Sequence, residues 1–170
     1  MWNVDGRRVV TAIPVSSRSA EGLLGDPMAA GKELPPERKL ILLVEDDESL
    51  RASVEKLLLS AGYSVKSAGN GLHGQQLLRT GSTFHLILSD LKMPGQTGLQ
   101  LLQWVRKSDS FQDIPFLIFT ASMAKQDLVL AAKLGVSEYI LKPSRNQEIL
   151  HKISKALANA EIMARSKATA

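Results

Sequence analysis

LILLVEDD, residues 40–47, joins five consecutive apolar side chains to three consecutive carboxylates. A short, almost continuous apolar run is typical of a strand that is buried on both faces of a parallel sheet. The carboxylates of Glu45 and Asp46 therefore follow directly on the end of a buried strand. Acidic residues at such a point also cap helices, and we expect Asp47 or Glu48 to do so. Because ligands of open α/β sheets bind at the carboxyl ends of the strands, this stretch marks that edge of the sheet as the candidate site.

Three further apolar runs end in a polar residue. They are LILS at 86–89 before Asp90, FLIF at 116–119 before Thr120, and YIL at 139–141 before Lys142. Taken singly, these residues have ordinary interpretations as a turn aspartate, a strand-end threonine and a solvated lysine. Together with Asp46 they place two carboxylates, a hydroxyl and an ammonium at one edge of a sheet. That combination suits a divalent cation and a phosphoryl group.

From residue 40 onward, the sequence alternates between patterns typical of strands and patterns typical of helices. Strands are predicted near 40–45, 63–67, 85–89, 115–119 and 138–141. Helical spacing follows each strand; it is clear at Leu50, Val54 and Leu58, and weakest at 70–80, where Gly71 and Gly74 count against a helix. This alternation predicts an α/β fold with a doubly wound, five-stranded parallel sheet.

The second predicted strand, at 63–67, alternates apolar with polar residues, which suits an edge of the sheet. The predicted strand order is therefore 2-1-3-4-5, with its switch point between the first and third strands. Asp46 and Asp90 end those two strands, so the expected ligand site lies between them.

We expect three segments. Residues 1–39 lack sustained periodicity and contain several prolines and glycines, which predicts a flexible N-terminal extension. Residues 40–160 form the single folded domain. Residues 161–170 form a C-terminal tail, which leaves no room for a second domain.

The composition excludes several classes of function. The net charge of +4 is spread along the chain, so it does not predict a nucleic-acid surface. The absence of cysteine excludes disulfides, thiolate zinc sites and a cysteine nucleophile, and it fits a reducing compartment. No apolar stretch approaches the roughly 18 residues of a membrane span. We therefore expect a cytoplasmic protein without direct membrane or nucleic-acid contacts.

A metal site is predicted at the switch point. Glu45 and Asp46 lie opposite Asp90 there, and clustered carboxylates repel one another unless a cation neutralises them. Mg²⁺ binds one or two carboxylates together with waters and phosphate oxygens. We therefore expect Asp46 to bind a metal ion rather than only to cap a helix, with Glu45 acting directly or through water. A carboxylate beside such a cation, as expected for Asp90, can attack phosphorus and form an acyl phosphate.

Four short motifs give the chain a specific resemblance. They are LVEDD at 43–47, SDLKMPG at 89–95, FTAS at 119–122 and LKP at 141–143. The intervals of 44, 30 and 22 residues between Asp46, Asp90, Thr120 and Lys142 are also those usual for the family. Over residues 40–160 the chain resembles the receiver domain of two-component response regulators, which has a flavodoxin-like fold. Each motif is weak alone, but four in this order are specific.

The resemblance implies a role for each site residue. Asp90 is the expected phosphoacceptor, and Glu45 and Asp46 form the acidic pocket for Mg²⁺. The backbone carbonyl of Lys92 completes the metal shell. Lys142 is the expected phosphate-binding lysine, and a cis peptide bond is expected between Lys142 and Pro143.

Two residues are expected to transmit the signal. By the same resemblance Thr120 is the switch hydroxyl, and Tyr139 occupies the aromatic switch position, whose side chain moves inward with Thr120. The implied function is a phosphorylation-activated switch rather than an enzyme. It would accept a phosphoryl group from a histidine kinase or a histidine phosphotransfer protein. Lacking an effector domain, it resembles the stand-alone type, whose output is protein binding through the fourth helix, fifth strand and fifth helix. A stand-alone regulator and a phosphorelay intermediate remain alternatives.

Two other classes of protein fit this sequence less well. Phosphohydrolases of the haloacid-dehalogenase type use an Asp-x-Asp motif, but the residue two after Asp90 is Lys92. A pseudo-receiver, which binds partners without chemistry, has usually lost the acceptor aspartate or the lysine. This chain keeps both, at Asp90 and Lys142.

Overall fold

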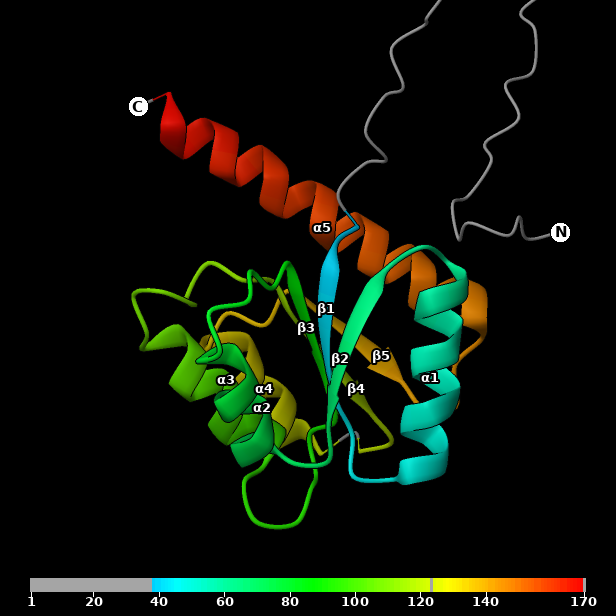
Figure 1. The fold of residues 1–170 in the computed structure, drawn as a ribbon. Coiled ribbons are helices and arrows are strands. Elements are labelled where there is room, and N and C mark those ends of the chain that lie inside the picture. Colours follow the sequence, from blue (N-terminus) through cyan, green and yellow to red (C-terminus); the bar gives the residue numbers. More distant parts are fainter. Residues whose placement is uncertain (1–37, 123, 170) are drawn as a thin grey trace, which may run out of the picture. The chain divides into compact units, whose positions relative to one another are not determined.

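The computed structural model describes residues 38–122 and 124–169. Within them five strands and five helices alternate along the chain (Figure 1). The strands are β1 (Leu40–Val44), β2 (Ser64–Ala68), β3 (Leu86–Ser89), β4 (Phe116–Thr120) and β5 (Glu138–Leu141). The helices are α1 (Glu48–Ser60), α2 (Gly71–Leu78), α3 (Gly98–Arg106), α4 (Lys125–Lys133) and α5 (Asn146–Ala168). None of these helices is long and apolar enough to cross a membrane. The predicted N-terminal extension lies outside the described residues, apart from its last two positions.

The strands form one parallel sheet in the order β2-β1-β3-β4-β5, which confirms the predicted topology. β2 is an edge strand, as its alternating sequence predicted. β1 and β3 are neighbours, and the pair Val44 and Ser89 closes their shared ladder. The first residues beyond β1 and β3 therefore emerge side by side at the carboxyl end of the sheet.

Helices cover both faces of the sheet (Figure 1). α1 and α5 lie on one face, and α2, α3 and α4 lie on the other. Successive side chains of a strand point to opposite faces. In β1, Ile41 and Leu43 pack in the core beneath α1 and α5, whereas Leu42 and Val44 pack in the core beneath α2 and α3. Burial on both faces explains why β1, β3 and β4 are almost uninterrupted apolar runs.

The helices α1, α2 and α3 begin with side-chain caps. The Oδ1 of Asp47 accepts a hydrogen bond from the amide of Leu50 at 2.8 Å, which confirms Asp47 as the cap of α1. Asn70 caps α2 in the same way. Thr97 and Gln100 form a reciprocal capping box at the start of α3. These caps fix the first turns of α1, α2 and α3, and the loops before α1 and α3 carry site residues.

Close packing explains the glycines that weakened the prediction of α2. A Cβ on Gly71 would lie 2.8 Å from the main-chain oxygen of Gln96, so α2 begins directly against the β3–α3 loop. A Cβ on Gly74 would lie 3.2 Å from the Cγ2 of Val44, so the helix also lies close to the sheet. Larger residues would displace α2 from both positions.

The fifth helix is longer than the sequence pattern indicated. α5 continues to Ala168, so most of the segment 161–170, which we expected to be a tail, is helical. Side chains from Glu161 onward are exposed and show no buried face, which is why the apolar periodicity ends near residue 160. The alanines of this stretch favour a helix without such a face. Two surface ion pairs lie along it, Lys39–Glu161 at 2.9 Å and Lys167–Asp113 at 2.6 Å.

Candidate functional site

The site residues continue the apolar rows of the strands. In β1, Ile41 and Leu43 are buried beneath α1 and α5, and Glu45 is the next residue in that row. The same alternation holds for Asp90 after Leu86 and Leu88, and for Lys142 after Ile140. Three polar groups from three strands therefore reach the same face at the carboxyl end of the sheet.

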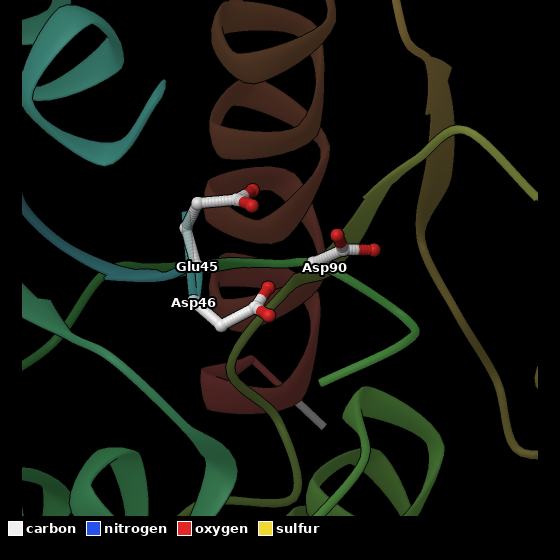
Figure 2. Close-up of side chains that lie close together, drawn as sticks. All are labelled: Glu45, Asp46 and Asp90. Atoms are coloured by element: carbon white, nitrogen blue, oxygen red, sulfur yellow. The ribbon is translucent and has the colours of Figure 1, made fainter. Parts of the chain in front are cut away.

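Three carboxylates meet where β1 and β3 end. One oxygen from each of Glu45, Asp46 and Asp90 lies within 4.8 Å of the others. Figure 2 shows Glu45 and Asp46 directed from the end of β1 toward the side on which Asp90 lies. Glu45 is 2% exposed and Asp90 is 9% exposed, whereas Asp46 is open to solvent. The cluster is therefore buried at Glu45 and Asp90 and accessible to solvent at Asp46.

Lys142 supplies the positive charge of the cluster. Its Nζ lies 2.6 Å from the Oε2 of Glu45 and 2.6 Å from the Oδ2 of Asp90. The same ammonium lies 4.9 Å from the ring centre of Phe119, a favourable cation–π distance. The peptide bond from Lys142 to Pro143 is cis, as expected.

The β3–α3 loop folds around Asp90. The Oδ1 of Asp90 accepts hydrogen bonds from the amides of Leu91 and Lys92, the second at 3.2 Å. A Cβ on Gly98 would lie 2.0 Å from the main-chain oxygen of Asp90, so only glycine allows α3 to start this close to the acid. With Lys142 on its other oxygen, the Asp90 carboxylate is held from both sides.

Burial is the main influence on the ionisation of Glu45. Burial raises the pKa of this carboxyl above its ordinary value, and the charge of Asp90 adds to the rise. The hydrogen bond and the charge of Lys142 act in the opposite direction but do not cancel the effect of burial. Repulsion by the carboxylate of Asp90 is therefore a smaller cause than burial.

Thr120 and Tyr139 lie on the other face of the sheet. Phe116, Ile118 and Thr120 alternate along β4, and the first two are buried beneath the helices α3 and α4. Tyr139 in β5 pairs in register with Ile118 and packs on the same core. Both candidate switch residues therefore face toward α4.

Hydrogen bonds connect Thr120 and Tyr139 to neighbouring residues. The Oγ1 of Thr120 accepts a hydrogen bond from the amide of Ser122 at 3.1 Å, and the main-chain oxygen of Thr120 accepts one from the amide of Lys142 at 2.9 Å. The hydroxyl of Tyr139 donates to the main-chain oxygen of Leu128 in α4 at 2.8 Å. Burial raises the pKa of Tyr139, which keeps this hydroxyl protonated.

The structure thus brings Glu45, Asp46, Asp90 and Lys142 into one cluster and joins Thr120 to it through the main chain of Lys142. Its three carboxylates offer oxygen ligands on a partly exposed surface, a donor set that fits Mg²⁺. The metal-binding role of the Lys92 carbonyl stays a prediction.

One residue of the site was not predicted: Arg51 in α1 donates to the main chain of Glu45 at 2.8 Å. Sequence alone gave no signal for it beyond a basic residue one turn after the acids.

The model of the response regulator receiver domain family matches residues 41–154. The chain belongs to this family. Among curated relatives of this receiver domain, the chemotaxis protein CheY of Pseudomonas aeruginosa is 33% identical over 116 residues, which cover 68% of this chain and 93% of CheY. The transcriptional regulatory protein GltR of the same organism is 33% identical over 121 residues, or 71% of this chain. This chain spans 50% of the length of GltR.

Solved structures agree with the family and with the fold. A CheY-like receiver domain protein from Methanospirillum hungatei has a TM-score of 0.70 and 28% identity, covering 74% of this chain and 98% of its own. CheY4 of Vibrio cholerae has a TM-score of 0.66 and 25% identity, covering 70% and 98%. Receiver domains are phosphoacceptor regulators of two-component systems that generally bind Mg²⁺ in an acidic pocket. They interact with histidine kinases or phosphotransfer proteins and with downstream targets.

Proposed function

We propose that this receiver domain accepts a phosphoryl group on Asp90 and signals through altered binding to a partner protein. The donor is the phosphohistidine of a histidine kinase or a histidine phosphotransfer protein. The N–P bond of the donor breaks with its electron pair left on the imidazole, and a carboxylate oxygen of Asp90 forms the new O–P bond. The product is an acyl phosphate, and the domain works as a regulator rather than as an enzyme acting on a metabolite.

The placement of Asp90 supports this proposal best. Its carboxylate lies 2.6 Å from the ammonium of Lys142 and shares a cluster with the carboxylates of Glu45 and Asp46. Phosphoryl transfer depends on positioning and on neutralising the charge of the transferred group. Lys142 is placed to bind a phosphoryl oxygen, and Thr120 offers a hydroxyl at the end of the next strand. Glu45, Asp46, Asp90 and the Lys92 carbonyl would hold Mg²⁺, which would neutralise further charge.

The output is proposed to pass through Thr120 and Tyr139 to α4. Movement of the Thr120 hydroxyl toward a phosphoryl group would free space on the face that Tyr139 shares. Tyr139 is tied to α4 through Leu128, so a change in its position reaches the helix directly. The surface of α4, β5 and α5 exposes apolar side chains on which a target protein could dock, namely Val129, Leu130 and Leu141.

Phosphorylation by a small donor tests the proposal. With acetyl phosphate and Mg²⁺, the full chain should gain one phosphoryl group, seen as a single mass increment that hydroxylamine removes. Asp90→Asn should abolish the increment, whereas Asp109→Asn, an exposed acid remote from the cluster, should retain it. Undiminished labelling of Asp90→Asn would overturn the assignment of the acceptor.

A second experiment tests the switch. Thr120→Ala should still be phosphorylated, more slowly, because Asp90 and Lys142 remain in place. The phosphorylated variant should fail to show the change in amide hydrogen exchange of α4 that phosphorylation produces in the wild type. A full change in α4 of phosphorylated Thr120→Ala would contradict the role of this hydroxyl.

A further inference from the structure

Arg51 connects α1 to the main chain of the acidic pocket. The residue lies in the first turn of α1, and its side chain reaches back toward the end of β1. Its Nη1 lies 2.8 Å from the main-chain oxygen of Glu45 and 3.4 Å from that of Asp46. These are the two residues whose carboxylates line the proposed metal site. One guanidinium therefore holds the backbone of both.

The position of this contact follows from the way β1 leaves the sheet. The amide of Glu45 still pairs with the oxygen of Ala68 in the neighbouring strand, at 3.0 Å. Beyond that point β2 has ended, so the next carbonyls of the β1–α1 turn have no strand partner. A main-chain carbonyl that is removed from water needs a donor. Arg51 supplies this donor.

The β2–α2 turn leaves room for the guanidinium. A Cβ on Gly69 would lie 3.6 Å from the Nη1 of Arg51, so the arginine head group lies beside this glycine. The amide of Arg51 itself donates to the main-chain oxygen of Asp47 at 2.8 Å. The turn is therefore fixed at Asp47 by the helix backbone and at Glu45 by the arginine side chain.

The charge of Arg51 is not used in an ion pair. Among residues 38–122 and 124–169, no carboxylate oxygen lies within 4.0 Å of its guanidinium. Its hydrogen bonds go to carbonyls, which leaves the carboxylate of Asp46 free to face Asp90. A salt bridge to Asp46 would instead have drawn this ligand away from the cluster.

We propose that Arg51 is a positioning residue of the acidic pocket, which strengthens Mg²⁺ binding by fixing the backbone of Glu45 and Asp46. This inference rests on the proposed function of the pocket. Two effects of Arg51 on the metal have opposite signs. Its positive charge opposes a nearby cation, whereas its hydrogen bonds keep the ligands in place. Loss of an outer partner of a metal ligand typically weakens metal affinity by about 10-fold or more, so positioning outweighs repulsion between the two cations.

The experiment measures Mg²⁺ affinity without phosphorylation. The urea midpoint of the full chain is followed as Mg²⁺ is raised from zero, in EDTA-treated protein, and the dissociation constant is obtained from the concentration dependence. The variants are Arg51→Met, which keeps an apolar stem without donors, and Arg51→Lys, which keeps the charge and one donor group. Asp46→Asn removes a proposed ligand. Arg79→Met is the matched control, because its guanidinium lies over Trp104 at 5.2 Å instead of in the pocket.

The proposal expects a dissociation constant about 10-fold higher in Arg51→Met, an intermediate value in Arg51→Lys and an unchanged value in Arg79→Met. Tighter Mg²⁺ binding by Arg51→Met would show that its charge is the dominant effect, and would overturn the proposal. An unchanged constant with a lower midpoint in EDTA would reduce Arg51 to a stabilising contact and would overturn it as well. If Mg²⁺ stabilises neither the wild type nor Asp46→Asn, the metal site of the proposed function fails, and the role of Arg51 fails with it.

Discussion

The ammonium of Lys142 lies 2.6 Å from a carboxylate oxygen of Asp90, a residue 52 positions earlier in the chain, and equally close to Glu45. One cation therefore bridges two acids. With Asp46 included, three carboxylates and one ammonium leave two negative charges when all four groups are ionised. A divalent cation would balance that charge, which is consistent with the Mg²⁺ site proposed above.

Replacement of Lys142 by methionine should destabilise the metal-free domain. The side chains of Lys142, Glu45 and Asp90 are 13%, 2% and 12% exposed, so loss of the ammonium leaves two buried acids without a counter-charge. We expect a loss of about 3 kcal/mol in the free energy of unfolding in EDTA. Mg²⁺ should restore part of this loss, because the metal no longer competes with the ammonium for the two acids.

Urea denaturation in EDTA and in millimolar Mg²⁺ measures both effects of the Lys142 substitution. Lys155→Met is the control, since this side chain is 58% exposed and pairs with Glu138 at 3.3 Å on the surface. Its removal should cost less than about 1 kcal/mol. Equal losses in the two variants would show that Lys142 has no special role in the cluster.

The pH dependence of stability should report on Glu45. Its pKa is raised in the folded protein, mainly by burial, so the folded state holds the proton more strongly than the unfolded state does. The contribution of this group is therefore complete below its ordinary value of 4.5 and is lost as the pH rises from there through the folded pKa. Glu45→Gln should remove this decline when unfolding is measured in EDTA. The exposed control Glu48→Gln should keep it, and a decline that persists in Glu45→Gln would have another source.

Tyr139→Phe should loosen α4. The substitution removes the hydrogen bond to the main-chain oxygen of Leu128 and should cost about 1 kcal/mol. Amide hydrogen exchange in α4 should become faster than in the wild type. Tyr63→Phe is the matched control, because the hydroxyl of Tyr63 has no hydrogen-bond partner in the described part of the chain and its loss should leave α4 unchanged. Unaltered exchange in Tyr139→Phe would show that the tyrosine does not hold the helix.

Arg106→Lys should destabilise the end of the sheet opposite the site. The guanidinium donates to the main-chain oxygens of Gly135, Gln112 and Ile114 at 2.9 Å, and so joins α3 to two separate loops. Burial lowers the pKa of Arg106, and the charge of Asp113 partly opposes this. One ammonium cannot reach all three oxygens, so we expect a loss of about 2–3 kcal/mol.

Urea denaturation measures this loss, and phosphorylation by acetyl phosphate should remain because the site is remote from Arg106. The exposed neighbour Lys107, replaced by methionine, should leave stability unchanged. Unchanged stability in Arg106→Lys would contradict the role of the three hydrogen bonds, and a similar loss in Lys107→Met would show that the effect is not specific to Arg106.

The strands and their order were predictable from the sequence because burial on both faces leaves a distinct pattern. The apolar runs at β1, β3 and β4 matched the structure within one residue at each end. The polar residue after each run then located the carboxyl edge of the sheet, and with it Asp46 and Asp90. Their placement in one cluster was predictable because parallel strands bring such ends together.

Features that depend on side-chain direction or on low hydrophobicity were not predictable. The hydrogen bonds of Arg51 are made to backbone oxygens, and the sequence of a strand end does not reveal which carbonyls lack partners. The last turns of α5 bury no apolar face, so periodicity could not distinguish them from a tail. Burial as the main influence on Glu45 also required the structure, because its sequence neighbours showed only the charges.

The alternation of side chains along the strands also constrains the register in which the strands pair. β1, β3 and β4 are apolar on both faces, so sliding one of them by a single residue would still bury hydrophobic side chains. A slip of β3 would, however, carry Asp90 to the opposite face from Glu45 and Lys142, and a slip of β1 would do the same to Glu45, so that a buried charge would lose its partner. The cluster therefore disfavours a shifted register of β1 or β3 that hydrophobic burial alone would tolerate. The groups that we assign to signalling also help to set the register of these strands.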